Sequence, residues 1–423
     1  MAIIPEISLF EYSEIEELGD LERFQIALEG IDDEELMQKL EKERQKGRDD
    51  YPVRVMWNLL IAMIVFEHKR VSTFRRELAR NAQLRRICGL IDGMRRKHLI
   101  PPHRVFTGFF KRVIKFKDEI DRIFEKQVME LYELIPGFGK TTAGDGKYLD
   151  SVAKNRPKED GKTKKAGKRR DNDARWSTKE YYYTDKAGKP QVKKEYHFGF
   201  KAHIVCDVAS ELPIAYSVTA ANADEKQEML KLLKCPVLSS EAHKQVAEYL
   251  LLDRGYDSKE MIVGIKDAGM SPVVDIRNCW KDGEETKQYK STDIVYNYKG
   301  DVYYVDDDCK NQKMKYEGYD KQKKCLRYSY NGKIHKIYIS CDERVFLPIA
   351  RDSEKFKKLY KGRTAVERLN GRLDRDYMFE DHCIRGLEKM DLMVSVSMII
   401  MNGMAVGKIR DGKTKLRSLK NVA

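Results

Sequence analysis

The stretch EYLLLDRGYDS, residues 248–258, decides the fold that the sequence predicts. Its apolar run from Tyr249 to Leu252 is typical of a buried strand, which Asp253 ends before Gly255 begins a turn. Helical patterns lie on both sides and a second strand pattern follows, in NADEKQEMLKLL (222–233), DSKEMIVGIKDAG (257–269) and SPVVDIR (271–277). Strands that alternate with helices predict an α/β unit with a partly parallel sheet.

Two aspartates in this unit lie where packing alone would not require an acid. Asp253 follows a central strand at its carboxyl end, which is where open α/β sheets carry their functional groups. Asp145 lies in the strand pattern TTAGDGKYLDS (141–151), between two glycines that leave room around the backbone. Each of them alone could equally be a turn-forming or capping aspartate.

A third acid, Glu367, interrupts the basic helical pattern YKGRTAVERLNGRLDRD (360–376). With about 100° of rotation per residue, an apolar stripe runs beside the polar stripe that carries Glu367, so we expect the glutamate at the margin of the core. The apolar stripe consists of Leu359, Val366, Leu369, Leu373 and Tyr377. The alternative is that Glu367 only forms a surface ion pair with Arg363, one helical turn away.

Convergence of the three acids would have a chemical consequence. Neighbouring carboxylates raise each other's pKa unless cations neutralise them. Ligands that are all oxygen suit Mg²⁺, with Mn²⁺ as a substitute. Two such ions can activate a water or a 3′-hydroxyl and stabilise the leaving oxygen in a phosphodiester displacement. Asp145, Asp253 and Glu367 are therefore the candidate catalytic and metal-binding residues.

The whole chain is basic. Over 423 residues, 81 Lys and Arg against 68 Asp and Glu give a net charge of +13. Such a surface attracts polyanions, nucleic acid first, with an acidic membrane surface as the competing explanation. The longest uncharged run, LMVSVSMIIMNGMAVG (392–407), is shorter than the ~20 residues of a spanning helix, so we predict a buried helix. The amino terminus lacks the basic start and cleavage site of a signal peptide, which predicts a cytosolic protein.

Three other regions differ from the α/β unit. The first part of the chain reads as short helices that carry Arg104, Lys111 and Arg112, which suits a helix-turn-helix-like DNA-binding module; a helical packing or dimerisation module is the alternative. Residues 155–180 are rich in Lys, Arg, Gly and Asp, and predict a disordered loop or a phosphate-binding arm. Tyr-rich alternation between residues 277 and 350 predicts an inserted antiparallel β module.

The eight cysteines contain no CxxC pair, so free thiols are expected. Four of them fall in or near the predicted β module, where a zinc site is conceivable: Cys279, Cys309, Cys325 and Cys341.

Several motifs together resemble those of one enzyme family. In chain order they are DGKYLD (145–150), HFGFKAHIVCD (197–207), LPIAYSVTAANADE (212–225), LLDRGYDS (251–258) and the spacing Tyr360, two residues, Arg363, three residues, Glu367. Their order resembles bacterial insertion-sequence DDE transposases with a ribonuclease-H-like catalytic domain, in particular the branch with the Tyr-x2-Arg-x3-Glu spacing. The likeness covers most of residues 50–405.

The resemblance implies roles for individual residues. Asp145, Asp253 and Glu367 would bind the catalytic Mg²⁺ ions, and Tyr360 and Arg363 would contact DNA phosphates. Trp280 is a candidate for stacking on an unpaired or flipped base, with a core anchor as the alternative. Lys201 and Asn222 are secondary candidates for holding DNA or for supporting the residues around the metal, whereas His203 is better explained as a structural histidine. The family has a lysine at the position of Asp374, so the phosphate contact assigned to that lysine is in doubt here.

The resemblance also implies an activity and partners. The expected protein is a cut-and-paste DNA transposase that binds terminal inverted repeats and target DNA, acts as a homodimer on DNA, and is cytoplasmic and nucleoid-associated. A catalytically silent DNA-binding protein and a metal nuclease without strand transfer are the alternatives. The expected domains are a helical DNA-binding domain (1–135), the first part of a ribonuclease-H-like catalytic domain (136–276), a β-rich insertion (277–350) and the C-terminal helices of the catalytic domain (351–423).

Overall fold

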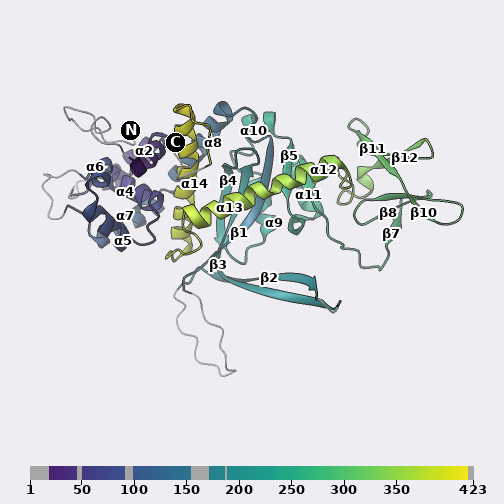
Figure 1. The fold of residues 1–423 in the computed structure, drawn as a ribbon, viewed down its shortest axis with the longest axis horizontal. Helices are drawn as coiled ribbons and strands as arrows, with labels where there is room; N and C mark the ends of the chain where they lie inside the picture. Colours follow the sequence, from purple (N-terminus) through teal and green to yellow (C-terminus); the bar gives the residue numbers. More distant parts are fainter. Residues whose placement is uncertain (1–18, 45–49, 91–98, 154–170, 186–187, 418–423) are drawn as a thin grey trace, which may run out of the picture.

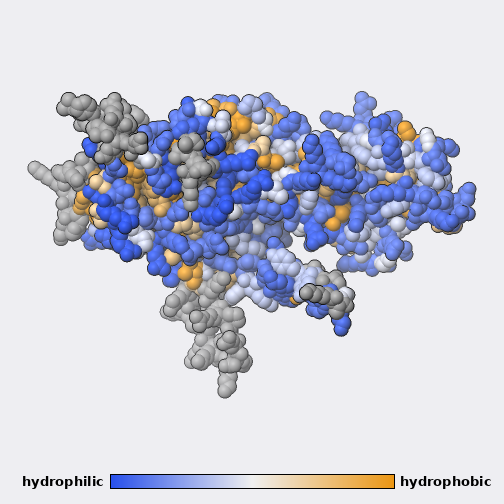
Figure 2. All heavy atoms as spheres, in the orientation of Figure 1, coloured by the Kyte–Doolittle hydropathy of each residue, from blue (hydrophilic) through white to orange (hydrophobic). Residues whose placement is uncertain are grey.

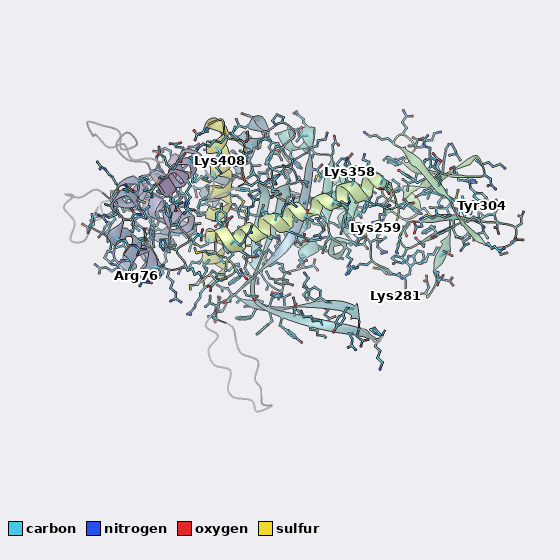
Figure 3. The ribbon with its side chains drawn as sticks, viewed as in Figure 1. Arg76, Lys259, Lys281, Tyr304, Lys358 and Lys408 are labelled. Carbon is cyan, nitrogen blue, oxygen red and sulfur yellow. The ribbon has the colours of Figure 1, made fainter. Side chains whose placement is uncertain are left out.

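The computed structural model describes residues 19–44, 50–90, 99–153, 171–185 and 188–417. The molecule is elongated, with a helical region at one end, a mixed sheet in the middle and a β-rich region at the other end (Figure 1). Most of the visible surface is hydrophilic (Figure 2). Basic side chains such as Arg76, Lys358 and Lys281 extend along the length of the molecule (Figure 3), in keeping with the net charge.

The amino-terminal region is helical, as the sequence predicts. Pro52 precedes the apolar helix α4, whose described side chains are almost all buried. Trp57 on this helix donates its indole N–H to Asp33 at 2.6 Å, which fixes α4 against the start of α3. The elements are η1 (Gly19–Leu21), α2 (Glu22–Glu29), α3 (Glu34–Arg44), α4 (Val53–Val65), α5 (Val71–Arg80), α6 (Ala82–Ile87), α7 (His103–Ile114) and α8 (Lys117–Leu134).

A mixed sheet forms the centre of the molecule. Its strands are β1 (Thr141–Asp150), β2 (Arg175–Thr184), β3 (Pro190–Asp207), β4 (Pro213–Ala220), β5 (Tyr249–Leu252) and β6 (Ser271–Val274). The order is β4-β3-β1-β5-β6, with β2 paired to the first half of β3. The strands β4, β3 and β1 are antiparallel, whereas β1, β5 and β6 are parallel. This arrangement confirms the predicted ribonuclease-H-like α/β fold class.

Helices pack against both faces of this sheet (Figure 1). They are α9 (Glu225–Leu232), α10 (Glu241–Val246), η2 (Arg254–Tyr256), α11 (Lys259–Asp267), α12 (Glu354–Tyr360), η4 (Lys361–Arg363), α13 (Thr364–Asp376) and α14 (Leu387–Arg410). The predicted apolar stripe is confirmed, because Val366, Leu369 and Leu373 of α13 are buried. The predicted single helix is instead interrupted by the 3-10 turn η4. A Cβ on Gly362 in this turn would lie 2.9 Å from Val208 and 3.1 Å from Leu251, so glycine permits the close approach of the turn to the sheet.

The apolar run near the carboxyl end forms the buried helix α14, as predicted. By length and composition this helix could cross a membrane, but 89% of its most apolar stretch is buried inside the protein. It packs against α2, α8 and β4. This burial is what the core helix of a folded domain shows.

The β-rich region lies between β6 and α12 and has its own apolar core, which includes Tyr296, Tyr328 and Phe346. Its four-stranded and three-stranded sheets are antiparallel, which confirms the predicted β-rich insertion in the α/β fold. The elements are β7 (Thr286–Gln288), β8 (Ile294–Asn297), β9 (Val302–Val305), β10 (Asn311–Lys313), β11 (Lys315–Asp320), β12 (Cys325–Tyr330), β13 (Lys333–Tyr338) and η3 (Ile339–Cys341).

The region predicted as a loop or a phosphate-binding arm is only partly described. Residues 154–170 lie outside the described residues. Residues 175–180 were expected to belong to the loop, but they form the first half of β2 instead. Cross-strand pairing with β3 overrides a local composition that is poor in apolar residues.

Candidate active site

The register of the parallel strands sets two of the candidate acids side by side. Ala143 of β1 is paired with Leu251 of β5, so Asp145 and Asp253, each two residues further on, reach the same level at the carboxyl end of β5. Asp253 also caps the turn that follows, because its Oδ1 accepts the N–H of Gly255 at 2.7 Å. Burial raises the pKa of Asp145 to about 6, and the nearby charge of Asp253 adds to this shift.

The glycines on either side of Asp145 have a packing role. A Cβ on Gly144 would lie 2.8 Å from the side chains of both Leu252 and Met229. A Cβ on Gly146 would lie 3.3 Å from the carboxyl group of Glu225. The room that the glycines leave is therefore occupied by α9 and by the end of β5, which brings Glu225 close to the acids.

Glu367 is separated from the two aspartates by an arginine. Its Oε1 accepts a hydrogen bond from Arg363 at 2.8 Å, and 48% of its side chain is exposed. Arg363 in turn lies close enough to Asp145 for its charge to lower the pKa of that carboxyl, against the larger effects that raise it. The surface ion pair that was the alternative for Glu367 is therefore present. Among the described residues, no three His, Cys, Asp or Glu side chains lie close enough to hold one metal ion.

Tyr360 and Arg363, the predicted phosphate contacts, are neighbours just before α13, since Tyr360 ends α12 and Arg363 ends η4. The centre of the Tyr360 ring lies 5.8 Å from the Arg363 guanidinium and 5.7 Å from the ring of Phe356, on which it stacks. Burial raises the pKa of Tyr360, and the charge of Asp275 adds to the effect. Both side chains are half-buried beside the acids.

Lys201, predicted as a secondary DNA contact, is buried instead. Its Nζ donates to Glu225 at 2.7 Å and lies 4.5 Å from the centre of the Tyr148 ring. Only 3% of the residue is exposed, so in this conformation a DNA phosphate cannot reach it. Sequence reasoning gave Glu225 no role of its own, although it is the last residue of the stretch LPIAYSVTAANADE. The structural explanation of His203 agrees with its burial and with its 2.9 Å contact to the hydroxyl of Thr219.

Asp374 forms an ion pair that explains how an acid is accommodated at this position. Its Oδ2 lies 2.6 Å from the Nζ of Lys147, which is on β1 two residues after Asp145. Because side chains alternate along a strand, Lys147 and Asp145 share the face that α13 covers. The position where the resembling family has a lysine therefore carries the opposite charge, and a lysine from the strand lies beside it.

The remaining predicted DNA contacts lie outside the central sheet, on α7 of the helical region and at the start of the insertion. On α7, Arg104 and Lys111 are exposed, and Arg112 is half-buried with its guanidinium 5.9 Å from the ring of Phe109. Trp280 is half-buried at the edge of the insertion core, 6.1 Å from the ring of Tyr296, and Lys287 lies 4.7 Å from its ring. Trp280 thus has a packing contact and still presents part of its ring to solvent.

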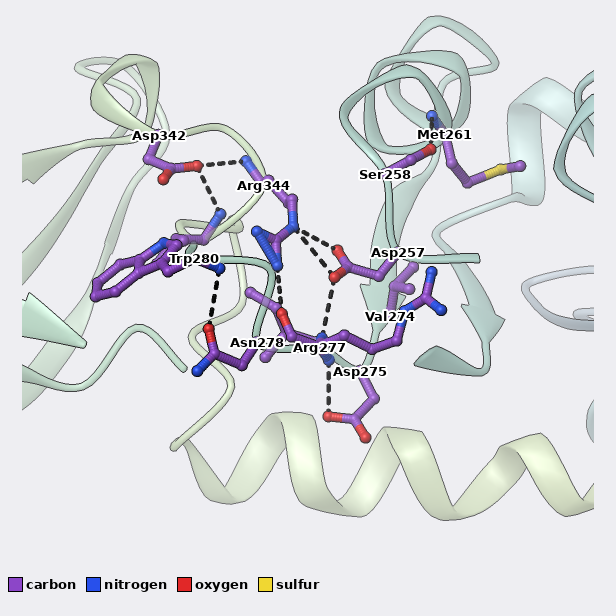
Figure 4. A network of polar contacts seen from close by, with 12 residues as sticks. Asp257, Ser258, Met261, Val274, Asp275, Arg277, Asn278, Trp280, Asp342 and Arg344 are labelled. Atoms are coloured by element: carbon purple, nitrogen blue, oxygen red, sulfur yellow. Dashed lines mark hydrogen bonds and ion pairs between the residues drawn. The ribbon is translucent and has the colours of Figure 1, made fainter. Parts of the chain in front are cut away.

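A polar network that sequence reasoning missed joins the turn after Asp253 to the insertion (Figure 4). The fully buried carboxylate of Asp257 accepts the Nε–H of Arg344 at 3.1 Å and the backbone N–H of Arg277 at 3.0 Å. Arg351 donates to the carbonyl oxygens of Val274 and Arg344. The entry and exit of the insertion are therefore held against the candidate site. The only signal in the sequence is a second acid in the stretch DRGYDS.

Comparisons with known proteins identify the family of this chain. Residues 156–402 match the family described as "Transposase DDE domain", a segment that includes Asp253 and Glu367 and begins after Asp145. No curated protein matches the chain. A piggyBac transposase, solved in a synaptic complex with hairpin DNA, shares 12% identity with a TM-score of 0.39, over 96% of this chain and 78% of that chain. Because the family match spans more than half of the chain, the protein belongs to the DDE transposases, DNA-transposing enzymes that generally use divalent metal ions.

Proposed function

We propose that this transposase works by cut-and-paste transposition, with Asp145, Asp253 and Glu367 as the ligands of its catalytic cations. The observation that carries the proposal is the register of β1 and β5, in which the two aspartates are level with each other. The raised pKa of Asp145 supports it, because a divalent cation would stabilise a carboxylate that burial, and then the charge of Asp253, disfavour. Mg²⁺, or Mn²⁺ as a substitute, would supply an activated water or 3′-hydroxyl for phosphodiester displacement.

Glu367 has to exchange its partner for this role. In the structure it is bonded to Arg363, whose charge also reaches Asp145. Neutralisation of the acids would release Arg363 toward a DNA phosphate, which its planar group can bind through two parallel hydrogen bonds. Tyr360, whose ring lies beside this guanidinium, would flank the same phosphate.

The other parts of the chain would hold the DNA and the second subunit. The helical domain (1–135) would bind terminal inverted repeats through Arg104, Lys111 and Arg112. The insertion (277–350), with Trp280, would divide the catalytic domain into its two parts (136–276 and 351–423). Two element ends must meet for excision and insertion into target DNA, so a homodimer on DNA is proposed, in the cytoplasm of a prokaryotic cell with the nucleoid as its site of action. The Tyr-x2-Arg-x3-Glu branch of bacterial insertion sequences remains part of the proposal.

One observation favours the alternative of a catalytically silent DNA-binding protein. Glu367 is engaged by Arg363 in a pair that a surface helix can form without any metal. A metal nuclease that cuts without joining is distinguished by the absence of strand transfer products.

The test is cleavage of a labelled duplex that carries the end of the element, in Mg²⁺, by the intact protein and by Glu367→Gln. The matched control is Glu354→Gln, which breaks an exposed ion pair with Lys357 on α12. We expect the intact protein and the control to cut, and Glu367→Gln to bind the duplex without cutting it. If all three proteins bind and none cuts, with Mn²⁺ giving no rescue, the silent DNA-binding protein is correct.

A further inference from the structure

A two-stranded arm extends the central sheet beyond the body of the protein (Figure 1). It consists of β2 and the first half of β3, paired from Arg175 with Gly199 to Thr184 with Pro190. From Gly199 onward, β3 belongs to the central sheet and pairs with β1. The arm is therefore a rigid continuation of the strand that borders Asp145.

Exposed aromatic side chains are concentrated on this arm. Of the nine large hydrophobic side chains that are exposed in the described part of the chain, five lie on it: Trp176, Tyr181, Tyr183, Val192 and Tyr196. Single exposed hydrophobic residues need no explanation, but a cluster on one projecting element marks an interaction surface.

The two faces of the arm differ in charge. Since side chains alternate along a strand, one face carries Lys179, Tyr181 and Tyr183, with Lys193 directly opposite Tyr181. We call these four residues the tyrosine–lysine face. The ammonium groups of Lys179 and Lys193 lie 5.4 Å and 6.0 Å from the centre of the Tyr181 ring. The opposite face carries Trp176, Val192 and Tyr196.

The tyrosine–lysine face leads toward the candidate acids. Ser177, two residues before Lys179 on this face, lies 2.9 Å from the hydroxyl of Tyr148 on β1. The Tyr148 ring in turn stacks on His197 at 3.9 Å and contacts Lys201. Burial would lower the pKa of Lys179, but Tyr181 and the negative charges of Asp145 and Glu225 raise it. The ammonium group of Lys179 therefore lies within electrostatic reach of Asp145 and Glu225.

We propose that the tyrosine–lysine face binds an unpaired DNA strand next to the candidate active site. The proposal rests on the proposed function, since only a DNA-cutting enzyme brings such a strand there. Tyrosine rings stack on any unpaired base, whereas the bases of a duplex are already stacked, and lysines bind phosphates. Exposed rings that alternate with lysines suit this ligand better than they suit the apolar surface of a second subunit. Lys193 is paired with Glu195 at 2.7 Å, and the exposed lysine can exchange this partner for a phosphate.

The test compares the two faces of the arm in binding assays without metal. The probes are a fluorescent single strand of about 20 nucleotides and the same sequence as a blunt duplex. The test variant is Tyr181→Ser with Tyr183→Ser, and the matched control is Tyr196→Ser, which removes an exposed ring from the opposite face. We expect the double variant to bind the single strand at least ~10-fold more weakly and the duplex within about twofold, because stacking acts only on unpaired bases. The control should bind both probes like the intact protein.

A second variant distinguishes a loss of DNA contacts from a folding defect. Lys179→Gln leaves the exposed rings in place and should reduce the salt dependence of single-strand binding by about one released counterion. Unchanged single-strand binding by both variants, an equal loss in the Tyr196→Ser control, or loss of self-association alone in the double variant would each overturn the proposal. Because these assays contain no metal, failure of the intact protein to cut DNA would reject the proposed function separately from the arm.

Discussion

The acids on the sheet and the acid on the helix are held in different ways. Asp145 and Asp253 are level because backbone pairing between β1 and β5 sets their positions, and neither can move without the sheet. Glu367 is on the surface of α13, about half exposed, and bonded to a flexible arginine. In the proposed metal site, strand pairing would hold Asp145 and Asp253 in place before a cation binds. Glu367 would first have to leave Arg363. The predictions below test this difference.

The largest effect is expected at the sheet. Under the proposed function, Asp145→Asn should reduce cleavage on the order of 1000-fold, because it would remove a cation ligand worth several kcal/mol at the transition state. Without metal the same change should stabilise the fold by up to about 3 kcal/mol at pH 8, since the folded pKa is about 6 against an ordinary 3.8. A raised pKa means that the ionised carboxylate opposes folding, so the intact protein should lose stability from about pH 4 to pH 6 and the variant should not.

Denaturant unfolding in a chelator across this pH range measures the effect on stability, and gel assays measure cleavage. Asp118→Asn, exposed in the first turn of α8, is the control and should keep the pH dependence of the intact protein. Identical pH profiles for the intact protein and Asp145→Asn would show that the pKa of Asp145 is not raised in the folded protein. A bound cation would then relieve no electrostatic cost at the two aspartates of the sheet.

A smaller effect is expected at the anchor of α13. Glu211 is buried in the turn between β3 and β4, and its Oε1 accepts from Arg368 at 2.5 Å and from Arg417 at 2.9 Å. Glu211→Gln should destabilise the protein by about 1–2 kcal/mol, less than a fully buried pair because both arginines are half exposed. It should lower cleavage less than tenfold, by loosening the helix that carries Glu367. Glu241→Gln, in an exposed pair with Lys244, is the matched control for stability.

The contrast between sheet and helix also explains what the sequence could predict. The apolar run before Asp253, the strand around Asp145 and the buried helix α14 are local patterns, and the structure confirms each of them. Lys147 contacts Asp374, which is 227 positions away, and Arg344 contacts Asp257, which is 87 positions away. A local periodicity in the sequence cannot predict contacts over such separations. The burial of Lys201 against Glu225 and the interruption of the helix at Gly362 likewise depend on tertiary packing. The resemblance implied metal-binding roles for the three acids, which stay a prediction, whereas the i,i+4 spacing predicted the ion pair of Glu367 with Arg363, which the structure confirms.

The smallest effect on stability is expected at Arg363. Its substitution also tests most directly whether Glu367 has to leave this arginine before it can bind a cation. Arg363→Gln removes a helical i,i+4 pair and should change stability by no more than about 0.5 kcal/mol. It should raise Mn²⁺ affinity several-fold in titration calorimetry without DNA, because the guanidinium of Arg363 no longer competes with Mn²⁺ for Glu367 and Asp145. Cleavage should nevertheless fall, since the phosphate contact is lost. Arg375→Gln, exposed on the same helix, should change neither quantity. Unaltered Mn²⁺ affinity in Arg363→Gln would mean that the arginine does not compete for the acids, and Glu367 would then be only the partner of a surface ion pair.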